Sequence, residues 1–110
     1  MLVSNEGNIT LITQETLEIK DLRKRIKEEY SNFSENNIIV NITSIETVTI
    51  EDILEFLDIS NTHRGNKHSF VIICNKIDID DVPDELVIVP TLQEAYDIIE
   101  MEEMERDLGL

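Results

Sequence analysis

The sequence is poor in the residues on which many catalytic and metal sites depend. It contains one cysteine, Cys74, and two histidines, His63 and His68. A single cysteine excludes an intrachain disulfide, and a reducing, cytoplasmic location is the simplest expectation. Both histidines fall in one short basic segment predicted to be a turn, so no acid–base pair or triad can be recognised. We therefore expect no catalytic residue, no metal and no cofactor.

Glycine is also scarce, with only Gly7, Gly65 and Gly109. Three such scattered glycines cannot form a glycine-rich phosphate loop. This matters because the segment Asn75-Lys76-Ile77-Asp78 copies the signature by which GTPases read guanine. A nucleotide-binding regulator that uses Asn75, Lys76 and Asp78 is an alternative function, and a strand end with polar turn residues is the simpler interpretation.

Long apolar runs are missing, and basic residues are few, with 9 Lys and Arg against 24 Asp and Glu. No run approaches the roughly 18 residues that a membrane span needs, and the N-terminus does not resemble a signal peptide. The net charge is −15, unevenly placed: residues 1–50 carry 8 acidic and 5 basic side chains, a net of −3, and residues 51–110 carry 16 and 4, a net of −12. Such a chain is repelled by nucleic acid and by anionic lipid, whereas a basic protein surface would suit it as a partner.

Strand and helix signals alternate, which predicts one α/β domain over residues 1–110 with helices packed on a mixed sheet of four or five strands. Glycine beside asparagine predicts a hairpin turn within Asn5–Asn8. The expected strands are Met1–Val3, Ile9–Thr13, Ile38–Ile42, Phe70–Cys74 and Val87–Val89. The expected helices are Leu17–Phe33, Ile50–Ser60 and Thr91–Leu108, and the acidic segment Asp78–Glu85 is expected to be a solvated loop with one short helical turn.

Capping boxes predict where two of the helices begin, one made by Thr49 with Asp52 and one by Thr91 with Glu94. Helical spacing then assigns the faces of the second helix. Its buried face is predicted to hold Ile50, Ile53, Leu54 and Leu57, which leaves Phe56 and Ile59 exposed.

The C-terminal helix has two apolar stripes. The first is the predicted core face, made of Leu92, Ala95, Ile98 and Ile99, and it turns polar at Glu102, Glu105 and Arg106. The second begins on another side with Met101, Met104 and Leu108. The helix is thus predicted to extend beyond its own core and to present a methionine-rich edge, which can adapt to varied partners or form a homodimer contact.

The order of elements, together with the residues of Asn37–Thr49 and Val87–Leu108, resembles the STAS domain family of anti-sigma-factor antagonists. The chain is also similar to small stand-alone STAS-like proteins of the Bacteroidetes type. The resemblance implies a STAS-like fold and a regulatory, protein-binding function.

In that family a kinase phosphorylates a serine within an Asp-Ser-Ser-Gly motif at the start of the second helix. The motif falls here on Thr49-Ile50-Glu51-Asp52, so the acceptor position is Ile50, which has no hydroxyl. Thr47 and Thr49 are nearby hydroxyls, but Thr49 is the expected cap. The resemblance therefore implies a binding module without the phosphorylation switch, with a candidate surface that includes Thr47, Thr49, Ile50, Glu51, Phe56 and the Met101–Leu108 stripe.

A third function is left open, that of an accessory subunit of an enzyme. Proteins of this appearance sometimes carry the label ribonuclease Z, an association that would connect the chain with RNA processing. Such an enzyme needs a cluster of histidine and aspartate ligands for two metal ions, and His63 with His68 cannot supply it.

Overall fold

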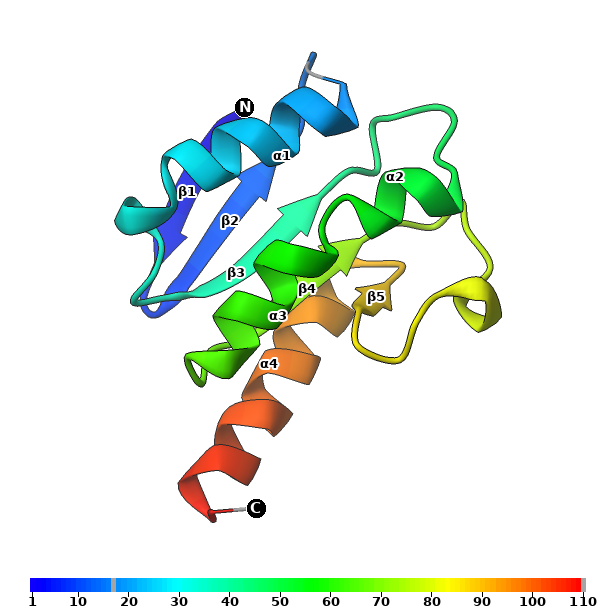
Figure 1. Ribbon diagram of the computed structural model, residues 1–110. Coiled ribbons are helices and arrows are strands. Elements are labelled where there is room, and N and C mark those ends of the chain that lie inside the picture. The colour runs from blue at the N-terminus through cyan, green and yellow to red at the C-terminus, as the bar shows by residue number, and fades with distance from the viewer. Residues whose placement is uncertain (17, 110) are drawn as a thin grey trace.

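A five-stranded mixed sheet forms the centre of the protein, with the strands in the order β1-β2-β3-β4-β5 (Figure 1). The computed structural model describes residues 1–16 and 18–109. β1 is antiparallel to β2, and the remaining neighbours are parallel. The bounds are β1 Leu2–Glu6, β2 Ile9–Thr13, β3 Asn37–Asn41, β4 Phe70–Ile73 and β5 Val87–Val89. The predicted α/β fold class with a mixed sheet is confirmed.

The hairpin at the N-terminus turns later than predicted. β1 continues through Asn5 and Glu6, and only Gly7 and Asn8 separate it from β2, with Glu6 opposite Ile9. Gly7 adopts φ +59°, a left-handed backbone conformation that glycine tolerates without steric cost. The glycine therefore fixes both the turn and the register of the strand pair.

Helices cover the two faces of the sheet unequally (Figure 1). α1, α2 and α3 lie on one face, where they pack with Ile38, Val40 and Ile72. α4 lies on the other face, where it packs with Ile39, Val71 and Ile73. Their bounds are α1 Ile19–Glu28, α2 Ile50–Leu54, α3 Leu57–Gly65 and α4 Leu92–Asp107, with 3₁₀ turns η1 Tyr30–Asn32 and η2 Ile79–Asp81.

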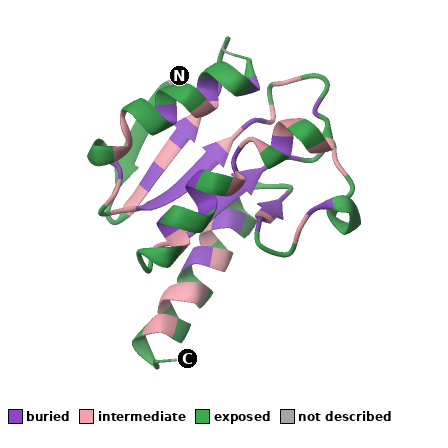
Figure 2. Cartoon of the chain, in the orientation of Figure 1, coloured by how far each residue is buried: buried purple, intermediate pink, exposed green. Residues whose placement is uncertain are grey.

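Burial follows this arrangement (Figure 2). β3 and β4 are buried almost throughout because helices cover them from both sides, whereas all five residues of β1 are exposed. The first predicted helix is shorter than Leu17–Phe33, since a 3₁₀ turn follows α1, and Leu17 lies outside the described residues. Among the residues that the structure does describe, no helix is both long enough and apolar enough to cross a bilayer.

The predicted second helix is in fact two helices, and this corrects the assignment of its faces. The amides of Glu55 and Phe56 bond to carbonyls three residues back, at Asp52 and Ile53, and α3 then begins at Leu57. Such tight turns advance each residue by more than the 100° of a regular helix.

That advance swings Phe56 into the core. Phe56 is fully buried, with its ring centroid 6.5 Å from that of Phe70, and Ile59 is also buried. Leu54, predicted to be buried, is instead 39% exposed. The prediction that Phe56 is exposed and belongs to a partner-binding surface is therefore wrong.

The predicted basic turn His63–His68 also needs correction. α3 continues to Gly65, and His63 is completely buried in its last turn. Only Asn66 and the residues after it leave the helix, with Lys67 at φ +67°.

Candidate functional site

The start of α2 has the local structure that the sequence predicts. The Thr49 side chain accepts a hydrogen bond from the Asp52 amide at 3.2 Å, and the Asp52 carboxylate accepts one from the Thr49 amide at 3.0 Å. This reciprocal capping box fixes the first turn of the helix. Ile50 is the first helical residue and is partly buried, while Thr47, Thr49 and Glu51 are exposed.

A shallow cleft of about 350 Å³ lies beside this turn, at the carboxyl ends of the parallel strands. Thr47 and Asp52 line it from the α2 side, and Glu18 and Ile19 line it from the start of α1. Its charged lining residues are both carboxylates, so the cleft disfavours phosphate and other anions.

The segment after β4 that resembles a guanine-recognition signature makes hydrogen bonds within the protein itself. The Lys76 ammonium donates to the carbonyls of Thr43 and Ile45, which hold the loop after β3, both at 2.5 Å. The Asp78 carboxylate accepts from the Asp80 amide at 3.0 Å and caps η2. Asn75 is exposed. These local contacts give Lys76 and Asp78 a structural reason to be present, and nucleotide binding stays an untested alternative.

The second stripe of α4 is exposed. Met101, Met104 and Leu108 are 49%, 59% and 72% exposed, respectively. Ala95 and Ile99 on the other side of the helix are buried against the sheet. The predicted core face is narrower than expected, because Leu92 is 37% exposed and Ile98 only partly buried. α4 and the start of α2 lie on opposite faces of the sheet, so the two parts of the predicted partner surface are not brought together (Figure 1).

The apolar core side of α4 ends at Ile99, as predicted, and the same side of the helix continues with polar contacts. Glu102 accepts hydrogen bonds from Arg64 Nη1 at 3.1 Å and from Ser69 Oγ at 2.6 Å. Glu103 accepts from the amide groups of Asn8 and Asn37. Polar contacts thus continue where the apolar ones stop.

This polar cluster lies at the amino ends of β2, β3 and β4, and sequence reasoning missed it. Asn37 and Ser69 are both buried, and the side-chain oxygen Oδ1 of Asn37 accepts from the backbone amide of Ser69 at 2.8 Å. The available signal was the spacing of Glu102 and Arg106, which continues the Ala95–Ile99 face at helical intervals. An adjoining polar cleft of about 240 Å³ has both acidic and basic side chains in its lining.

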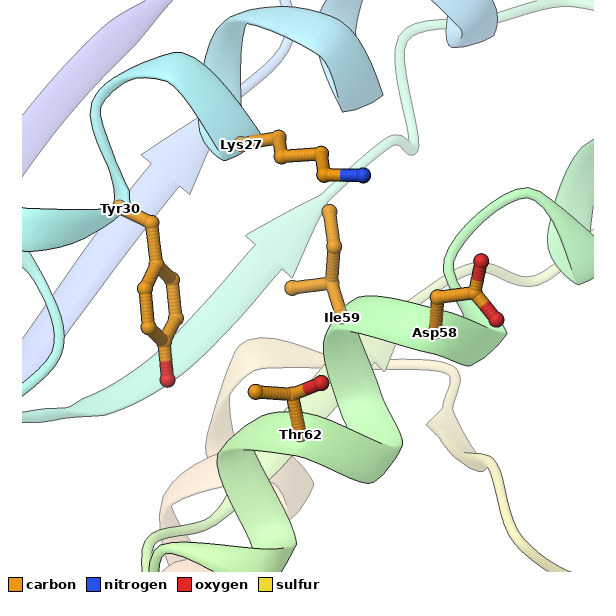
Figure 3. Close-up of a pocket in the computed structure, with 5 residues that line it drawn as sticks. All are labelled: Lys27, Tyr30, Asp58, Ile59 and Thr62. Atoms are coloured by element: carbon orange, nitrogen blue, oxygen red, sulfur yellow. The ribbon is translucent and has the colours of Figure 1, made fainter.

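A small cleft of about 190 Å³ separates α1 from α3 (Figure 3). Lys27 and Tyr30 reach into it from the α1 side, and Asp58, Ile59 and Thr62 line it from α3. Its interior is largely apolar, and its two charged groups have opposite signs.

Tyr30, which lines this cleft, contacts the buried His63 through its hydroxyl. Tyr30 Oη lies 2.5 Å from His63 Nδ1, and His63 Nε2 lies 2.6 Å from the carbonyl oxygen of Asn36. Since a carbonyl can only accept, Nε2 carries the proton and Nδ1 accepts from Tyr30. Burial lowers the pKa of His63 to about 4, with smaller contributions from His68 and Arg64. The imidazole is neutral at pH 7 and both of its nitrogens are engaged.

Metal binding finds no support in the part of the chain that the structure describes, where no group of three or more His, Cys, Asp or Glu side chains is placed to hold an ion. Cys74 is buried at the end of β4.

Comparisons with known proteins establish the fold. No protein-family model and no curated protein matches the sequence. Solved structures do match, among them the NMR structure of the protein TM1081, with a TM-score of 0.66 over 89% of this chain and 86% of that chain. At 14% identity this similarity concerns the fold alone.

Proposed function

We propose that the chain is a non-catalytic protein-binding module of the STAS type that lacks the phosphorylation switch. One observation carries the proposal: three large apolar side chains, Met101, Met104 and Leu108, are exposed together on the outward face of α4. Clustered exposed apolar side chains mark interaction sites far more often than singly scattered ones do. Methionine in particular accommodates partners of different shape.

The charge around the stripe indicates what kind of partner fits. Glu100 and Glu105 are exposed neighbours of the methionines on α4, and Asp97 lies one turn before Met101. A second copy of the same helix face would bring these carboxylates against one another. A basic amphipathic segment of another protein would instead pair its charges with them and cover the apolar centre.

The start of α2 supports a module that is not regulated by phosphorylation. Ile50 occupies the position of the family's phospho-acceptor, and the neighbouring Thr49 hydroxyl is engaged as a cap. Glu51 and Asp52 add negative charge in the first turn, where the helix dipole favours it. We expect incubation with an anti-sigma kinase and ATP to leave the intact mass unchanged. Stoichiometric phosphate on Thr47 or Thr49 would contradict this part of the proposal.

Binding to the stripe can be tested with a designed helical peptide of leucine and lysine, compared with its leucine–glutamate counterpart. We expect saturable binding of the basic peptide only, weakened by salt because the flanking charges are screened. Replacement of Met101, Met104 and Leu108 with Gln should abolish it and leave folding nearly intact, since exposed substitutions change stability by about 0.5 kcal/mol or less each.

The matched control is Ile79→Gln, which removes an apolar side chain of similar exposure from η2. It should bind the basic peptide like the unmodified protein. A large loss of melting temperature in the triple variant would mean that the stripe belongs to the core, and undiminished peptide binding would mean that the partner surface lies elsewhere.

A further inference from the structure

The two edges of the sheet are protected very differently. β5 is only three residues long and is followed directly by Pro90, and a short strand beside proline is a poor template for another strand. β1 has five residues and contains neither lysine nor proline. It is the outermost strand of the sheet, so its outer backbone groups have no strand partner within residues 1–16 and 18–109.

Apolar side chains accompany this open edge on both faces. Leu2 is 58% exposed and Val3 is 39% exposed, and as neighbours in a strand they point to opposite faces. On the face of Leu2, α4 packs against β3, β4 and β5, which leaves β1 uncovered. Another strand placed beside β1 would therefore bury apolar surface as well as pair the backbone.

The charge of the molecule is low at this edge. Glu6 is the only charged side chain in residues 1–13, and α1 has five basic and two acidic side chains, a net of +3. α1 lies over the β1–β2 side of the sheet (Figure 1). Most of the negative charge is carried by residues 51–110, so two copies that meet at β1 keep their acidic regions apart.

We propose that β1 pairs antiparallel with β1 of a second copy, which makes a symmetric dimer with a continuous ten-stranded sheet. In the register centred on Ser4, each Ser4 faces its counterpart, Val3 lies opposite the second copy's Asn5, and Leu2 lies opposite the second copy's Glu6. In this register even-numbered residues pair with even-numbered ones and odd with odd. Paired side chains therefore point to the same side, and the faces of the two sheets are aligned. It also places each Glu6 away from the other.

Disulfide trapping tests the register. Residues directly opposite in an antiparallel pair have Cα atoms about 4.5–5.5 Å apart, within the range of a disulfide. We expect Ser4→Cys to form a covalent dimer under mild oxidation. Glu6→Cys is the matched control, because its counterpart would be displaced by four residues, or about 13 Å. The unmodified protein, whose one thiol is buried, should not cross-link.

Sedimentation velocity over a range of concentrations tests the dimer itself. We expect a reversible monomer–dimer equilibrium whose dissociation constant rises by at least about tenfold in two variants. Leu2→Glu puts a carboxylate directly opposite the second copy's Glu6, and Val3→Lys puts two like charges at diagonal positions of the strand pair. Both residues are exposed, so thermal melting should stay close to that of the unmodified protein.

The α4 variant with three Gln substitutions should keep the β1 dimer, so failure of this inference and failure of the proposed function give different results. A protein that is monomeric at every concentration would overturn the inference. So would a dimer that is insensitive to both Leu2→Glu and Val3→Lys, or cross-linking of Glu6→Cys as efficient as that of Ser4→Cys.

Discussion

Helical spacing predicts that Leu54 is buried and Phe56 exposed, whereas the structure has the reverse. The different contributions of these two side chains to stability can be measured. Phe56 is fully buried against Phe70, so Phe56→Ala removes a large core side chain and should lower the free energy of unfolding by about 3–5 kcal/mol. Leu54→Ala, at a position that is 39% exposed, should cost about 1 kcal/mol or less. Urea unfolding of the two variants checks this. A larger loss in Leu54→Ala than in Phe56→Ala would mean that one continuous helix is the better description.

The stability of the protein should depend on pH through one buried side chain, His63. Its pKa is about 4 in the folded chain and about 6.5 when unfolded, so below pH 6.5 the unfolded state binds a proton that the folded state does not. Stability is therefore complete above pH 6.5 and falls as the pH drops toward 4, by up to about 3 kcal/mol.

The comparison that isolates this contribution is His63→Gln against His68→Gln. Carboxylates titrate in both proteins, so their effects cancel in the difference. Relative to the unmodified protein, the stability deficit of His63→Gln should shrink as the pH falls from 7 to 4, whereas that of His68→Gln should change little. Equal pH dependence in all three proteins would show that the pKa of His63 is the same in the folded and unfolded chains.

The burial of individual side chains was the feature least predictable from the sequence. The apolar pattern identified Ile53 and Ile99 as core residues because their helices are regular at those points. It failed at Phe56, because it assumes 100° per residue and cannot detect where a helix tightens into 3₁₀ turns. It also failed at His63, since nothing in a single sequence tells that Tyr30 and Asn36 supply both hydrogen bonds of a buried imidazole.

At the scale of the element, α4 is held by two kinds of contact. Ala95 and Ile99 bury apolar surface, and Glu102 bonds to Arg64 and Ser69. Glu102→Ala should lower the free energy of unfolding by about 1–3 kcal/mol, because it leaves a partly buried guanidinium and a buried hydroxyl without their acceptor. Glu105→Ala, on an exposed position of the same helix, should have an effect within about 0.5 kcal/mol. Equal effects would contradict the distinction between the two sides of α4.

Elements were predicted better than their contacts. The strands β2, β3, β4 and β5 were found within a residue or two, since buried β-branched runs bounded by polar turns have few alternatives. The caps of α2 and α4 were both found, as Thr91 accepts from the Glu94 amide. The predicted return bond differs at α4, because the Glu94 carboxylate accepts from the Thr91 hydroxyl at 3.3 Å and not from the Thr91 amide. The polar cluster around Asn37 could not be found, because it joins four segments that are distant in sequence.

For the whole molecule, the net charge of −15 should make stability depend on salt. Repulsion among the carboxylates of residues 51–110 destabilises the compact state and is screened by added ions. We expect the melting temperature to rise by about 2–5 °C between about 10 mM and 0.5 M sodium chloride. Ion pairs such as Arg64–Glu102 are weakened by the same salt, so a falling melting temperature would mean that local pairs outweigh the general repulsion.

The position of α4 after all five strands has a consequence for synthesis on the ribosome. The first face of the sheet can be closed by α1, α2 and α3 as soon as their neighbouring strands emerge, because all three precede β5 in sequence. The second face, with Ile39, Val71 and Ile73, has only α4 to cover it. The nascent domain therefore has one face of its sheet bare and apolar until α4 has emerged from the ribosome, and transiently exposed apolar surface of this kind favours aggregation.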